Sequence, residues 1–218
     1  MYNKLVIIVP REFSVKEYTK NSIEDFIKKK IKIEIWIVKK ILNSLIDIDK
    51  KLLISNQNIT FKIINNFTDL RENLSHETKS TLFDLRIKLN TKTKNFFFTF
   101  FEFDFDFLII SGLQSRNFNL FYRIFLNIKN LAIQIIFLIN KIKIKPSKYV
   151  FLLGEKSDTK FDSLVNKKSI LIKGHHADYD RFLEKKEDIT KIKKDYFVFI
   201  DQNVPFHQDL VEMNKNDI

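Results

Sequence analysis

Short apolar runs that end abruptly in Gly, Pro or polar residues limit most strongly how this chain of 218 residues can fold. The runs occupy residues 5–9, 31–38, 61–64, 106–111, 149–153, 169–173 and 196–200. Buried parallel strands read as short continuous apolar runs of this kind, and helical patterns separate most of the runs here. The sequence therefore predicts an α/β protein with a Rossmann-like, doubly wound, mostly parallel sheet and helices on both faces.

Four stretches between these runs carry helical patterns, at residues 22–30, 39–51, 69–89 and 118–143. The first can start at a Ser22 cap and ends in three lysines, which suits the helix dipole. In residues 69–89 leucines recur near the helical period, so we expect one helix there. Residues 118–143 are strongly apolar but contain Arg123, Asn127 and Lys129, so we expect a buried core helix and not a membrane span.

The Phe-rich segment at residues 96–110 allows two interpretations. Either it packs in the core as the approach to a strand at residues 106–111, or it forms an exposed patch that docks on a partner or a membrane. The second would make the chain a non-catalytic α/β binding module, and it requires Phe96, Phe98 and Phe100 to be exposed to solvent.

The composition excludes some classes of protein. The chain has no Cys, which rules out disulfides and thiolate metal sites. Its net charge of +11 is spread along the sequence, so we read it as a solvated surface and expect no nucleic-acid partner. The N-terminus lacks a signal-peptide pattern. We expect a cytoplasmic protein, with peripheral association at the inner face of the membrane as a further option.

The loop after the run at residues 169–173 is the richest in chemical groups. It contains Gly174, His175, His176, Asp178 and Asp180. Three interpretations stay open: a divalent metal site, contacts to a sugar or nucleotide with one His as acid or base, or a structural loop whose Asp residues cap the next helix. Because the spacing matches no known ligand frame, we predict no metal site.

A second polar cluster follows the run at residues 196–200. It can hydrogen-bond ligand hydroxyls, or it can be a Pro-containing interdomain turn. In a parallel sheet the loops after the other predicted strands would lie at the same edge as these two polar clusters. The candidate ligand-binding residues outside the loop described above are Arg11, Glu12, Gly112, Gly154, Asp201, Gln202, Asn203 and His207.

Residues 173–183 and 197–209 contain an HxxDYD loop and an FxDQxxPxHxD segment. Together they resemble proteins of bacterial surface-polysaccharide (capsule and O-antigen) biosynthesis that look like GT-B glycosyltransferases, which are built from two Rossmann-like domains. The resemblance implies that residues 1–195 form the N-terminal, acceptor-side domain. Residues 196–218 would be the interdomain strand and the start of a truncated second domain.

The resemblance also implies roles. His175 or His176 would be the base for an acceptor hydroxyl, with Asp178 beside it, while the other candidate residues hold a carbohydrate acceptor or nucleotide sugar. No tightly bound cofactor is expected, because the nucleotide-sugar donor would bind only with a second domain. The chain alone is then expected to be inactive, since transfer needs both substrates aligned.

Overall fold

The computed structural model describes residues 2–10, 23–42, 59–111, 120–153, 159 and 162–174. All of them belong to the first of two compact units, residues 1–180, and the second unit, residues 181–218, lies outside the described residues. The predicted domain boundary at residues 195 and 196 also lies outside them and stays a prediction.

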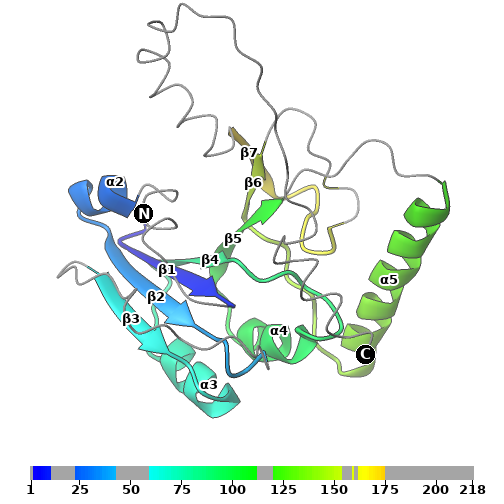
Figure 1. Cartoon of the computed structure of the whole chain (residues 1–218), viewed down its shortest axis with the longest axis horizontal. Coiled ribbons are helices and arrows are strands. Elements are labelled where there is room, and N and C mark those ends of the chain that lie inside the picture. The colour runs from blue at the N-terminus through cyan, green and yellow to red at the C-terminus, as the bar shows by residue number, and fades with distance from the viewer. Residues whose placement is uncertain are drawn as a thin grey trace, which may run out of the picture. The chain divides into compact units, whose positions relative to one another are not determined.

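Within the described residues, seven strands form one sheet in the order β3-β2-β1-β4-β5-β6-β7, and every neighbouring pair is parallel (Figure 1). The chain winds outward from β1 in one direction and from β4 in the other, which is the doubly wound arrangement that the sequence predicted. The strands are β1 (Lys4–Val9), β2 (Lys32–Ile37), β3 (Ile59–Ile63), β4 (Thr81–Leu85), β5 (Asp106–Ser111), β6 (Tyr149–Leu153) and β7 (Ile170–Gly174).

Helices lie on both faces of the sheet. They are α2 (Ile23–Lys28), α3 (Phe67–Ser75), α4 (Lys94–Phe101) and α5 (Leu120–Ile139). Ile23 of α2 belongs to an apolar cluster with the odd-numbered positions of β1 and β2, such as Ile7 and Ile35. The even-numbered positions, such as Val6 and Ile8, join a larger cluster with α3, α4 and α5. Figure 1 shows α2 on one side of the sheet and α3 and α4 on the other. The central strands are therefore buried on both faces.

The prediction of one helix over residues 69–89 is wrong. Helix α3 ends at Ser75, and the following residues form β4 between β1 and β5. Phe83 and Leu85 point into the larger apolar cluster, whereas Leu82 packs on the α2 side. Leucine spacing at residues 82, 85 and 89 imitates a helical period, but the strand period of two decides the packing once both faces are covered.

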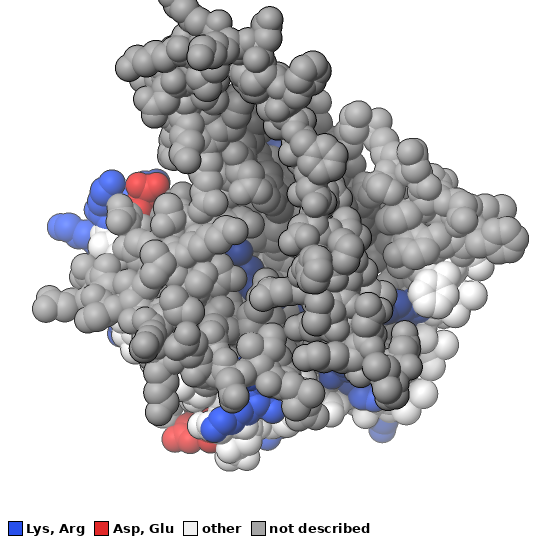
Figure 2. Space-filling view, in the orientation of Figure 1, with Lys and Arg blue, Asp and Glu red and all other residues white. Residues whose placement is uncertain are grey.

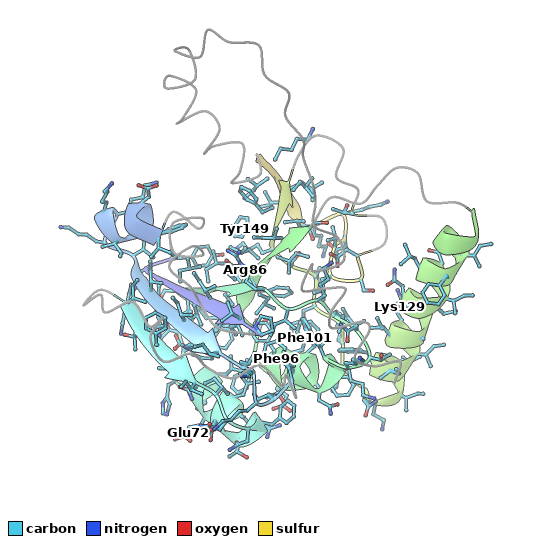
Figure 3. The ribbon with its side chains drawn as sticks, in the orientation of Figure 1. Glu72, Arg86, Phe96, Phe101, Lys129 and Tyr149 are labelled. Atoms are coloured by element: carbon cyan, nitrogen blue, oxygen red, sulfur yellow. The ribbon has the colours of Figure 1, made fainter. Side chains whose placement is uncertain are left out.

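The Phe-rich segment spans most of α4, the turn after it and the start of β5, and its rings belong to the larger apolar cluster or pack against it. Phe96, Phe97 and Phe100 are at most 1% exposed. Phe98 is half-buried and packs edge-on against Phe137, with ring centroids 4.7 Å apart. Figure 3 shows Phe96 and Phe101 on the α4 side of the sheet. The interpretation as a core segment is confirmed, and the hypothesis of a binding module that docks through exposed Phe rings is wrong.

Two further expectations of burial are wrong. Among the side chains of α5 that the structure describes, only Ile133 and Phe137 are buried. Strand β7 was predicted to be buried, but Ile170 and Ile172 are exposed, because β7 is the last strand of the described sheet. Residues 39–42 form turns, and the rest of the predicted helix at residues 39–51 lies outside the described residues, as does the run at residues 196–200. None of the described helices combines the length and apolarity needed to cross a membrane.

A buried carboxylate lies in β2. Glu34 accepts a hydrogen bond from the Trp36 indole at 3.1 Å and pairs with the ammonium groups of Lys4 at 2.8 Å and Lys62 at 3.1 Å. Burial alone would raise the pKa of Glu34. The hydrogen bonds from Lys4, Trp36 and Lys62 outweigh burial and lower the pKa to about 2.

The lowered pKa makes stability depend on pH. Because the folded pKa lies below the ordinary value of 4.5, Glu34 stabilises the fold above pH 4.5 and loses this contribution as the pH falls to about 2. We expect the free energy of unfolding of the wild type to fall over this range by on the order of 3 kcal/mol more than that of Glu34→Gln. Urea denaturation at a series of pH values measures both. Parallel pH profiles for the two proteins would contradict the assignment.

The burial of α4 gives a second prediction. Phe100→Ala removes a ring that contacts Phe83, Phe96 and Phe107, so we expect a loss of about 3–5 kcal/mol in the free energy of unfolding. The control Leu138→Ala truncates a side chain that is 76% exposed, and it should cost less than about 0.5 kcal/mol. Chemical denaturation measures both. Similar small losses would mean that α4 is not packed in the core.

Candidate functional site

The carboxyl ends of the seven parallel strands lie at one edge of the sheet. In doubly wound folds ligands bind beyond this edge, at the point where the strand order reverses. Here that point lies between β1 and β4, because β2 extends the sheet on one side and β5 on the other. The backbone N–H of Arg86 donates to the Ile8 carbonyl at 3.0 Å, which prolongs the β1–β4 pairing to the edge.

An ion pair occupies the end of β4 at this switch point. The guanidinium group of Arg86 donates to both carboxylate oxygens of Asp84, at 2.6–2.8 Å. The Asp84 side chain is 5% exposed, and that of Arg86 is 26% exposed. Residues two apart in a strand share a face, which brings the pair together. Arg86 therefore presents a partly exposed, fixed cation beside the end of β1.

Lys39 lies at the end of β2, next to β1. The backbone N–H of the preceding residue, Val38, donates to the Val9 carbonyl at 3.0 Å, so the two strand ends stay paired up to this point. Lys39 is 8% exposed, and within the described part of the chain its ammonium group has no hydrogen-bond or ion-pair partner. A poorly hydrated, unpaired cation is costly. Lys39 is therefore suited to contact an anionic ligand group at this edge.

A pocket of about 330 Å³ opens at the same edge, beyond β2 and β3. This size is in the range of small-molecule sites. It combines two lysines and three asparagines with apolar side chains, and the Lys40 ammonium donates to the Asn65 side-chain carbonyl at 2.6 Å. The lining residues are Lys40, Ile41, Leu42, Asn65, Asn66, Phe67, Lys92, Asn95 and Phe96. Such a lining can hold hydroxyl groups or an anion.

Two helices begin at this pocket. Asn66 caps α3 by accepting a hydrogen bond from the Asp69 backbone N–H at 2.8 Å. The N-cap of α4, Thr93, makes no such bond, because its hydroxyl donates to the Lys88 carbonyl at 2.7 Å instead. The first turn of α4 therefore adds a positive partial charge to the pocket side of the molecule.

Gly174 is the one sequence-predicted site residue that the structure describes. It ends β7 at the carboxyl edge of the sheet, and residues 175–180 after it lie outside the described residues. A Cβ atom at this position would collide with the ring of Phe151 on β6. The absence of a side chain thus lets the Phe151 ring pack against the strand end, which is a packing role.

The remaining predicted residues lie outside the described residues, so the structure does not bring them together or separate them. They are Arg11, Glu12, Gly112, Gly154, His175, His176, Asp178, Asp180, Asp201, Gln202, Asn203 and His207. In the part of the chain that the structure describes, no three His, Asp or Glu side chains are grouped to hold a metal ion.

The sequence analysis missed Lys39, Asp84 and Arg86. The sequence signal for the Asp84–Arg86 pair is an acid and an arginine two residues apart in an apolar segment. This spacing brings the two side chains together only if the segment is a strand, and the sequence predicts a helix there. Lys39 stood in a predicted helix as one half of a Lys-Lys pair. Its burial comes from the fold and has no local signature.

Comparison of the chain with protein-family models, with curated proteins and with solved structures gave no match. The chemistry of this edge therefore has to be inferred from its own residues.

The Asp84–Arg86 pair gives a prediction with an internal control. Arg86→Ala leaves a buried carboxylate unpaired, so we expect a loss of about 3–5 kcal/mol in the free energy of unfolding. The exposed pair of Arg71 and Glu102 has the same bidentate geometry at 2.7 Å, but Arg71→Ala should cost far less stability, because water screens both of its charges.

A double variant separates the pair from the packing of the arginine. Asp84→Leu with Arg86→Ala removes the buried charge as well, so this protein should be more stable than Arg86→Ala alone. Denaturation of the four proteins measures the difference. Equal losses at the buried and exposed pairs would show that the Asp84 carboxylate reaches water.

Proposed function

We propose that this chain is the acceptor-side domain of a glycosyltransferase-like protein of bacterial surface-polysaccharide biosynthesis. The observation that carries the proposal is the position of Gly174, which ends β7 at the same edge of the sheet as the switch point between β1 and β4. The HxxDYD pattern that resembles those proteins follows Gly174 directly in the sequence.

The chemistry of the described edge is compatible with this role. Sugar hydroxyls need donors and acceptors held in place, and phosphate groups need cations. Lys39, Arg86 and the amide and lysine groups of the pocket supply the donors. The nucleotide-sugar donor would be held by a second Rossmann-like domain facing this edge, contacted through residues 201–207.

The reaction assigns a role to each group of the loop. His175 or His176 takes the proton of an acceptor hydroxyl while that oxygen forms a bond to the anomeric carbon of the donor sugar. The bond from that carbon to the nucleotide phosphate breaks, and the nucleotide leaves with the electron pair. Asp178 and Asp180 accept hydrogen bonds from acceptor hydroxyls. Arg11, Glu12, Gly112 and Gly154 stand at the ends of neighbouring runs, where they can line the same cleft.

Acceptor binding by the chain itself tests the proposal. We expect saturable binding of bacterial glycan fragments, and a loss of at least about tenfold in affinity for Asp178→Ala with Asp180→Ala, because each removes a charged hydrogen-bond acceptor. Titration calorimetry and saturation-transfer NMR measure the affinity.

The control is Asp25→Ala, which removes an exposed aspartate of α2 and should leave glycan affinity unchanged. Because transfer needs donor and acceptor aligned between two domains, an acceptor-side domain by itself is expected to transfer no sugar from a panel of nucleotide sugars. Unchanged glycan affinity in the Asp178 and Asp180 variant would refute the site, and robust transfer by the chain alone would refute the two-domain interpretation.

A further inference from the structure

Helix α5 has two apolar sides. Ile133 and Phe137 are buried against the larger apolar cluster. On roughly the opposite side of the helix lies a second set of apolar residues, which are between 46% and 76% exposed. We call this set the outer stripe of α5, and it consists of Ile124, Ile128, Leu131, Ile135 and Leu138.

The outer stripe is continuous. Its members are spaced by four, three, four and three residues, which keeps them on one side of a helix along most of its 20 residues. Scattered exposed apolar residues are ordinary, but a contiguous row is typical of an interaction surface. Packing in the core does not explain the row, because the side chains of the row point away from the apolar cluster that contains Ile133 and Phe137.

The sequence that carries the stripe has charge of a single sign. Residues 107–154 contain seven Lys and Arg residues and no Asp or Glu. Lys141 and Lys143, which follow the helix, are exposed and form no ion pair with a described residue. Lys129, labelled in Figure 3, lies four residues before Ile133 and therefore on the row of the buried residues, away from the stripe. Figure 2 shows blue and white atoms, without red, on the visible part of the α5 side. The stripe is thus followed by two exposed cations and has no acidic residue in its own segment.

We propose that the outer stripe of α5, with Lys141 and Lys143 after its last turn, docks this chain on the surface of an anionic lipid bilayer. A helix with an apolar face and cationic neighbours lies in the plane of the headgroups with its apolar side chains among the acyl chains. The lysines contact anionic headgroups, each adding attraction near the surface. This surface is separate from the carboxyl edge of the sheet, so docking through it does not depend on the proposed function.

A second copy of the chain fits this surface less well. A two-fold dimer would place the outer stripe against itself, because such interfaces use the same patch on both subunits. The cationic surroundings would then also face each other with no acidic residue between positions 107 and 154 to compensate. A bilayer that contains anionic lipid supplies the missing charge.

Sedimentation with lipid vesicles tests the proposal on the full chain. We expect binding to vesicles of phosphatidylglycerol and phosphatidylcholine, weaker binding at high salt, and little binding to phosphatidylcholine alone. Ile128→Asn with Leu138→Asn should reduce binding at least about tenfold, since two side chains no longer enter the bilayer. Lys141→Gln with Lys143→Gln should reduce it by a similar factor on anionic vesicles only.

The matched control is Ile63→Asn, which changes an exposed isoleucine of β3 in the same way and should bind vesicles like the wild type. All variants should unfold at the wild-type temperature, since the changed residues are exposed. The proposal is overturned if anionic vesicles do not bind the chain, or if the stripe variants bind as well as the control. It is also overturned if the stripe variants instead dissociate a dimer seen by analytical ultracentrifugation.

Discussion

The packing around Phe83 holds the sheet and its helices together. This ring lies in the central strand β4 and contacts Trp36 of β2, Phe100 of α4 and Phe105 before β5, with ring centroids 4.9–5.8 Å apart. One side chain thus ties three segments that are distant in the sequence. Aromatic rings in edge-on contact combine a large buried area with a preferred geometry, so the cluster fixes orientation as well as position. The position of β4 at the switch point depends on it.

The buried charged groups at the amino and carboxyl ends of the strands differ in how completely they are paired. Near the first residue of β1 the Glu34 carboxylate meets two ammonium groups and an indole N–H. At the carboxyl edge Asp84 has a partner in Arg86, but Lys39 is buried without one among the described residues. Buried polar groups with complete partners stabilise a fold, whereas an uncompensated one has a cost that binding can offset. The carboxyl edge is where a ligand gains most.

The sequence predicts an element correctly where the local pattern of apolar residues agrees with the burial of that element in the structure. Residues 106–111 and 149–153 were predicted as strands and coincide with β5 and β6. The prediction from local pattern was wrong where residues distant in the sequence decide which side chains are buried. The leucines of β4 fit both the helical and the strand period, and the prediction of a helix there leaves Asp84 and Arg86 out of the candidate site. The strongly apolar sequence of α5 predicts burial, although seven of the apolar side chains that the structure describes in this helix are exposed.

The order of the strands also constrains how the chain comes together in time. Lys4 of β1 pairs with Thr81 of β4, 77 residues later. When the chain grows from its N-terminus, β1 can pair with β2 early, but its other edge stays open until β4 has been made. Parallel sheets of this kind close long loops before they gain contacts, and their open edges invite mispairing in the meantime. The pairing at the switch point, beside the candidate ligand edge, therefore cannot form until β1, β2 and β3 have all been made.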